Sequence, residues 1–317
     1  MNKSTLKYIG KRLLISIATL FIILLILFLM LKFMPGTPFN DEKLTVAQKV
    51  LLNAKYGLDK SIPEQFFRYV GNMLKGDFGV SYTIQKNMPI AQMLAPKIMV
   101  SFKIGLQSVI LGSIIGIILG IIAAIKHNTI WDTLATFVSV LGVSIPSFVF
   151  AIVMLILFGF TFPIFPITYN SSQPFFSSIL PTIALSMFTI AQIARFSRSE
   201  MIDVLGSEYM LLAESKGLSN KLLIFKHALR NALIPVITVL APLIVNLMTG
   251  STVIEKICGI PGIGSLLVEA IQVNDYNVVL ALSFIYSAMY VITMLIVDIL
   301  YGIIDPRIRL TKEDGHE

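Results

Sequence analysis

The sequence has few charges, few histidines and a single cysteine for its length. Only 14% of its 317 residues are charged, whereas soluble domains carry about 25%. The one cysteine, Cys258, excludes an internal disulfide bond. The motifs G-x-x-x-x-G-K-[ST], H-E-x-x-H and G-x-S-x-G are all missing. These absences argue against a soluble enzyme and predict a chain that does not itself hydrolyse ATP and has no catalytic residues, cofactor or metal site of its own.

Apolar residues dominate instead. They make up 56% of the chain, and the mean hydropathy is +0.82, which predicts an all-α polytopic membrane protein. The net charge of +7 fits an excess of Lys and Arg in cytoplasmic loops. A nucleic-acid partner is not expected, because no soluble domain presents a basic patch.

Six transmembrane helices are predicted from stretches without a charge. A crossing helix needs about 20 apolar residues. One stretch is too long for a single crossing, and prolines and a polar run at 163–174 divide it into helices near 133–160 and 178–195. The five uncharged stretches are Leu13–Leu31, Ile104–Ile125, Thr133–Ala194, Asn231–Ile254 and Tyr276–Val297.

The distribution of Lys and Arg sets the orientation. The basic N-terminus, the turn at Lys126, the segment after the fourth helix and the C-terminal tail fall on one side, so both termini are predicted to be cytoplasmic. The loop 161–177 has no Lys or Arg and is placed outside. All three histidines then lie on the cytoplasmic side, which excludes a histidine relay across the membrane.

Residues 32–103 are also placed outside, since long segments cross with less regard to charge. Their pattern predicts helices at Thr45–Tyr56 and Ile62–Leu74. This segment is expected to be a cap on the outer mouth, a contact surface for an extracellular binding protein, or both. Near the other end, four helix-breaking residues precede a short helix at Leu266–Ile271, and the whole suits an external re-entrant element. These breakers are Gly259, Pro261, Gly262 and Gly264.

A polar segment from Arg195 to Pro235 has a helix–glycine–helix pattern. Tyr209, Leu212 and Ala213 fall on one face of the first helix. Gly217 ends that helix, because it accepts a positive φ. Ser219 or Asn220 begins a second helix that carries several cations. A short helical pair with this charge predicts a docking surface.

The run AESKGLSNKLLIFKHALRNALIP within this segment resembles the coupling loop of ABC-importer permeases of the oligopeptide/dipeptide/nickel family. The general Glu-Ala-Ala element is represented only by its last residue, Ala213, while Gly217 is in place. His227 is the first residue of the sequence His-Ala-Leu-Arg-Asn-Ala, which is common in this branch of the family. The coupling-loop residues so identified are Tyr209, Leu212, Ala213, Glu214, Gly217, Lys221, His227, Leu229 and Arg230.

Other parts resemble the first, B-type, permease of the same family, most closely the oligopeptide permeases. They are Tyr8–Leu14 with Met34–Pro38, Gly76–Ser81, Pro261–Gly264 with Asp275–Tyr276, and Asp298–Tyr301 with Asp305–Arg307. The resemblance divides the chain into helix 1 with its external segment (1–95), a type I ABC-importer permease core (96–305, coupling loop about 200–231) and a cytoplasmic tail (306–317).

The resemblance implies a cell-membrane permease subunit of an ATP-driven importer that forms a peptide pathway with a second, homologous permease. Two cytoplasmic ATPase subunits would hold ATP and Mg²⁺, and an extracellular substrate-binding lipoprotein would deliver the solute. Membrane lipid is the remaining partner. Nickel or another small solute is the alternative cargo.

An ion-coupled secondary transporter would need carboxylates within the spans and a pseudo-repeat, and a membrane-embedded enzyme would need a catalytic cluster there. None of these features is visible in the sequence. Asp298 is expected near the cytoplasmic interface, beside a Lys or Arg. Candidate pathway residues, each of which is equally suited to helix–helix contacts, are Ser144, Ser147, Gln192, Asn246, Thr249 and Ser251.

The predicted topology has a direct test. Reporter fusions after Gln173 and after Ser215 are expected to report opposite sides of the membrane, because one predicted crossing, the helix near 178–195, separates the two points. A common location for the two reporters would refute the six-helix arrangement.

Overall fold

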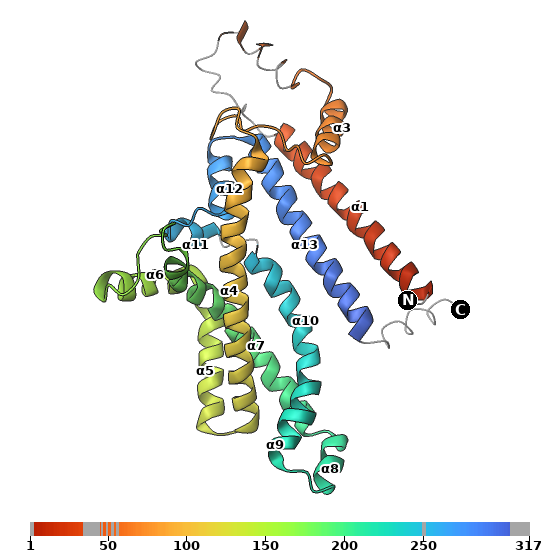
Figure 1. The fold of residues 1–317 in the computed structure, drawn as a ribbon, viewed down its shortest axis with the longest axis vertical. Coiled ribbons are helices and arrows are strands. Elements are labelled where there is room, and N and C mark those ends of the chain that lie inside the picture. The colour runs from red at the N-terminus through yellow and green to blue at the C-terminus, as the bar shows by residue number, and fades with distance from the viewer. Residues whose placement is uncertain are drawn as a thin grey trace. The chain divides into compact units, whose positions relative to one another are not determined.

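The computed structural model describes residues 3–33, 57–248 and 252–304, with isolated positions between 45 and 54. These residues are almost entirely helical or in turns, and their strand-like pairing is limited to one isolated bridge between Val80 and Pro89. The chain divides into two compact units, residues 1–99 with 262–317 and residues 100–261. Figure 1 shows the elements of each.

The first unit contains α1 (Lys3–Phe33), α3 (Ile62–Met73), α12 (Ile263–Gln272), α13 (Tyr276–Ile304) and the beginning of α4 (Ile90–Ile125). Helix α1 packs along α13. The predicted helix at Ile62–Leu74 is confirmed, and Ser61 caps it by accepting a hydrogen bond from the Glu64 amide at 3.4 Å. The helix predicted at Thr45–Tyr56 lies largely outside the described residues.

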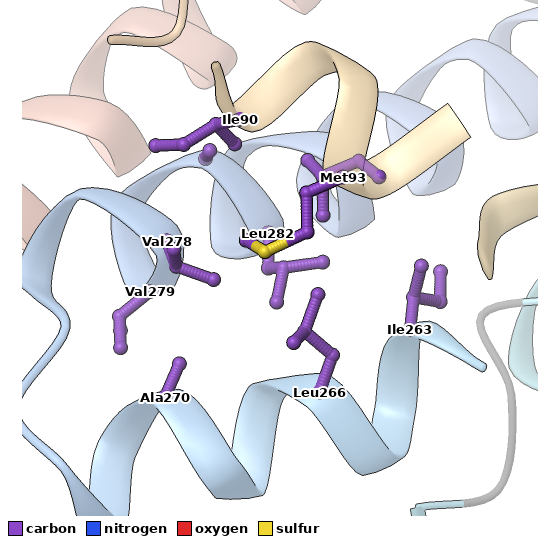
Figure 2. Packing of buried hydrophobic residues seen from close by; sticks show 10 residues of the cluster. Ile90, Met93, Ile263, Leu266, Ala270, Val278, Val279 and Leu282 are labelled. Carbon is purple, nitrogen blue, oxygen red and sulfur yellow. The ribbon is translucent and has the colours of Figure 1, made fainter. Parts of the chain in front are cut away.

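A buried apolar cluster joins three of these helices, as Figure 2 shows. The side chains come from the start of α4, from α12 and from the first turns of α13, and they are Ile90, Met93, Leu94, Ile263, Leu266, Ala270, Val278, Val279, Ala281 and Leu282. The short helix predicted before α13 is confirmed but begins at Ile263, so the prediction that Gly264 interrupts the helix is wrong. A helical glycine costs about 1 kcal/mol, and burial of Ile263 and Leu266 offsets that cost.

The second unit contains the rest of α4, α5 (Ile130–Ser144), α6 (Ser147–Met154), the π-helix η2 (Leu155–Thr161), α7 (Pro174–Leu205) and the elements from α8 to α11 (Thr252–Ile257). The single helix predicted near 133–160 is wrong, because the helices on either side of Pro146 meet at a bend of 103°. Ile145 is extended, with φ −88° and ψ 121°, as expected of a residue before proline.

Four described helices are long and apolar enough to cross a membrane: Ile9–Phe33, Ile90–Ile125, Pro174–Leu205 and Tyr276–Val297. The bent pair Ile130–Ser144 and Ser147–Thr161 makes a fifth crossing if it counts as one span. The remaining predicted stretch corresponds to α10 (Leu229–Met248) and α11, between which residues 249–251 lie outside the described ranges. The all-helical membrane fold is confirmed, and six crossings are compatible with it.

Helix α4 approaches α7 through three glycines spaced four residues apart. A Cβ atom on Gly112 would lie 2.7 Å from Thr189 Cβ, and one on Gly120 would lie 2.6 Å from the Ala194 carbonyl oxygen. Gly116 is as close to α7, and Gly142 of α5 approaches the Met187 carbonyl of α7 in the same way. Small residues at such positions let helix backbones come together in a membrane, so α4 and α5 both hold α7 closely.

The close contact between α4 and α7 predicts that one added methyl group lowers the stability of the protein. In Gly116→Ala the new Cβ would lie 2.8 Å from Ile193 Cβ and 2.9 Å from the Ile190 oxygen. Overpacking costs about 1–3 kcal/mol, so the purified protein is expected to melt at a lower temperature. Gly10→Ala is the matched control, because nothing lies within 4 Å of a Cβ there. Equal melting temperatures for the two variants would contradict the close packing.

Candidate functional site

The polar segment predicted to dock a partner forms a compact group of short helices. Helix α7 continues to Leu205 and is followed by α8 (Glu208–Ser215), α9 (Asn220–Leu222), the π-helix η3 (Leu223–Ala228) and then α10. The predicted helix–glycine–helix pattern is confirmed. Gly217 has a φ of +76°, and nothing lies within 4 Å of a Cβ placed on it. Its contribution is therefore its backbone conformation rather than its small size.

An apolar interior holds these helices together. The buried side chains are Met201, Met210, Leu223, Ala228 and Ala232, joined by Ala124 at the end of α4. Two of the predicted site residues, Ala213 and Leu229, are partly buried and pack against this cluster. The structure thus places both of them in the internal packing of the loop. The cluster also fixes the loop against α4.

The loop exposes both large apolar side chains and charged side chains. Leu211 is 61% exposed, Leu212 57% and Phe225 64%, and Tyr209 and Leu222 are also exposed. The exposed charged side chains of the same loop are Glu208, Glu214, Lys216, Lys221, Lys226 and Arg230. Large exposed apolar side chains among charged ones are typical of a protein-binding surface.

The sequence motif identified only part of this surface. Tyr209 and Leu212 lie on it, and the Tyr209 hydroxyl accepts a hydrogen bond from Asn231 Nδ2 at 2.9 Å, which ties α8 to the start of α10. His227 is half-buried in η3. Leu211, Leu222 and Phe225 were missed, although large apolar residues inside a polar segment were a usable signal.

An ion pair between Arg198 of α7 and Asp132 joins α7 to the first turn of α5. Asp132 is 6% exposed. Arg198 donates from Nε to Asp132 Oδ1 at 2.6 Å and from Nη2 to Oδ2 at 2.8 Å. The Asn128 amide donates to Oδ2 at 3.0 Å, and His127 Nδ1 lies 3.1 Å from the same oxygen. Bidentate pairs of this kind combine strength with fixed geometry.

This contact was not predicted from the sequence, because its partners are far apart in the chain and belong to no motif. Arg198 stands one helical turn before Met201, whose side chain is in the interior of the loop. The ion pair therefore couples the base of the candidate docking loop to the α4–α5 turn.

The predicted pathway residues are only partly described. Ser144 is exposed at the end of α5 and Ser147 is half-buried at the start of α6, so the two flank the bend at Pro146. Gln192 is half-buried on α7. The side chain of Asn246, and Thr249 and Ser251, lie outside the described residues.

In the first unit, two of the motifs that carry the family resemblance meet at a buried carboxylate. Asp275 is fully buried and accepts a hydrogen bond from the Ser81 hydroxyl at 2.5 Å. The backbone amides of Tyr82, Thr83 and Ile84 donate to it at 3.0–3.2 Å. A carboxylate with this many donors is a structural anchor, so these motifs fix the loop at 79–84 to the start of α13.

The lone cysteine has no features of a reactive thiol. Cys258 is 2% exposed, and burial raises the pKa of its thiol to about 11, so the thiol stays protonated at neutral pH. Among the described residues, no group of three or more His, Cys, Asp or Glu side chains is placed to hold a metal ion.

The backbone conformation of Gly217 predicts a difference between two substitutions. Valine strains a positive φ by about 1–2 kcal/mol, whereas asparagine tolerates it. Gly217→Val is expected to reach the membrane at near-normal abundance but to co-purify poorly with the ATPase subunits that the family resemblance implies. Gly217→Asn should retain them, and so should Gly206→Ala, where φ is −82°. Normal co-purification of Gly217→Val would show that the loop tolerates this strain.

Comparison with known proteins identifies relatives of this chain. Residues 116–310 match the family described as binding-protein-dependent transport system inner membrane component. The dipeptide transport system permease protein DppB of Lactococcus lactis subsp. cremoris is 45% identical over 304 residues, which cover 96% of this chain and 99% of that protein. DppB of Bacillus subtilis is 40% identical over 97% of this chain and 99% of its own length. The oligopeptide transport system permease protein OppB of Salmonella typhimurium is 41% identical, covering 96% and 99%. The chain therefore belongs to the family of inner membrane permease components of binding-protein-dependent transport systems.

Proposed function

We propose that this chain is the permease subunit of an ATP-driven peptide importer and that it forms the membrane pathway together with a second, homologous permease. The observation that carries the proposal is the near full-length similarity to dipeptide and oligopeptide permeases in a chain whose loop presents an apolar docking surface. The same relatives favour peptides over nickel or another small solute. An ion-coupled secondary transporter is the remaining alternative.

The docking loop is the proposed contact with one of two cytoplasmic ATPase subunits. Leu211, Leu212 and Phe225 would fill a groove on that subunit. The exposed charged side chains of the loop would select the partner. ATP and Mg²⁺ are held by the ATPases, and this chain supplies no nucleotide site. In this proposal both termini of the chain are cytoplasmic, and an extracellular binding protein delivers the peptide on the other side.

The proposed coupling runs through α7. Displacement of the docked loop moves the end of α7, because the cluster around Met201 packs the loop on that helix. The ion pair between Arg198 and Asp132 passes the displacement to the α4–α5 turn, and the close glycine contacts keep α4 and α7 together. The bend at Pro146, between α5 and α6, then lies within the part of the protein that this displacement moves.

In this proposal, hydroxyl and amide side chains line the pathway rather than charges. Ser144 and Ser147 at the bend, and Gln192 on α7, are the described candidates. Neutral hydrogen-bonding groups suit a peptide, because they contact its backbone without fixing one sequence. Asn246, Thr249 and Ser251 complete the proposed set.

The proposal is tested by reconstitution in vesicles. The chain alone is expected to show no ATP hydrolysis and no peptide uptake, since the ATPases supply the nucleotide site. With the second permease, both ATPases and the binding protein, it should take up a labelled dipeptide or oligopeptide only when ATP reaches the ATPases. Uptake by the chain alone under a proton gradient would establish a secondary transporter. Competition by Ni²⁺ and not by peptides would establish a metal importer.

A further inference from the structure

Helix α3 presents two neighbouring apolar stripes, of which only one is covered by the protein. Phe66 is 3% exposed and Met73 9%, and they stand seven residues apart on the covered stripe. Phe67 is 65% exposed and Leu74 80%, and they stand seven residues apart on the next stripe. In an α-helix, positions seven apart share a face, and adjacent positions are turned by about 100°.

The covered stripe packs against the C-terminal half of α1, and Figure 1 shows the two helices side by side there. The Phe66 ring centroid lies 5.4 Å from that of Phe28 and 5.5 Å from that of Phe21, both edge-on. Tyr69 approaches Phe28 at 6.5 Å. Leu24 of α1 and Leu280 of α13 complete the same cluster.

These contacts set the depth of α3. Phe21 and Phe28 lie within Ile9–Phe33, the part of α1 that is long and apolar enough to cross a membrane. Lys32 marks the end of that span, and its Nζ lies 5.7 Å from the centroid of the Phe28 ring. A charged side chain is costly in the hydrocarbon core, so the boundary of the span is expected near Lys32. Phe66 therefore packs on α1 within this span, between Phe21 at its middle and Phe28 nearer its Phe33 end.

The part of α1 on which α3 packs also exposes apolar side chains. Ile22, Ile26 and Met30 of α1 are 54%, 52% and 65% exposed, as expected of side chains that face acyl chains. On α3, the charged and exposed side chains of Glu64 and Arg68 lie beyond the stripe of Phe67, on the side away from the covered stripe. A helix with packed, apolar and charged stripes in this order has the form of an interfacial helix.

We infer that α3 lies at the membrane beside the C-terminal half of α1, with Phe67 and Leu74 inserted among the lipid acyl chains. Helix α3 is then in contact with lipid beside α1 and is not a cap surrounded by water. This inference depends on the membrane location of α1 and is independent of the transported solute.

The single tryptophan, Trp131, makes a fluorescence test possible. In a Trp131→Phe background, Phe67→Trp would report the inferred lipid stripe and Arg68→Trp the charged stripe of the same helix. The full chain is placed in phosphatidylcholine vesicles with or without bromine on the acyl chains. The Trp at 67 should be quenched by brominated lipid about twofold more than the Trp at 68, with the reverse order for acrylamide in the water.

Two results would overturn the inference. Equal and strong acrylamide quenching at both positions would place α3 in water. Protection of the Trp at 67 from both quenchers would mean that protein covers the stripe. Leu74→Trp with Lys75→Trp repeats the comparison at the other end of the stripe, so the test does not depend on the folding of one variant.

Discussion

The close contact of α7 with α4 and α5 is the constraint on which the second unit depends. In lipid there is no hydrophobic driving force between helices, so association relies on packing and on hydrogen bonds. Gly112, Gly116 and Gly120 remove the side chains that would keep α4 away from α7, and Gly142 does the same for α5. The docking loop follows the end of α7. The backbone contacts that hold α7 against α4 and α5 therefore also determine the position of the loop.

Two buried carboxylates are stabilised by different means, and the difference matches their positions. Asp275 receives a hydroxyl and three backbone amides from one short loop; fixed dipoles of this kind rigidify a local structure. Asp132 is instead paired with the guanidinium of Arg198, a long side chain from another helix. This bidentate pair fixes the geometry between two helices, and it lies where the proposed coupling passes movement from one helix to the other.

Much of this architecture could be predicted from residues that act locally. Uncharged stretches predict spans because the bilayer demands about 20 apolar residues, and Gly217 predicts its own turn because few residues accept a positive φ. Features set by distant partners could not be predicted. The pairing of Asp132 with Arg198 and the inward position of Ala213 follow from packing between helices. The bend of 103° at Pro146 also depends on what surrounds it.

The docking loop separates its two tasks between its two sides. Its inward side chains include small residues such as Ala213, Ala228 and Ala232, which allow the short helices to pack closely on α7 and α4. Its outward side chains are large and apolar, with Leu211 and Phe225 more than half exposed. If the interior of the loop were poorly packed, a displacement by the partner would only rearrange the loop. A well-packed loop transmits the displacement to α7. The positive φ of Gly217 belongs with the inward side, since it sets the angle at which the second helix returns to the cluster. Partner affinity and mechanical stiffness are thus determined by different residues, and the two can vary independently.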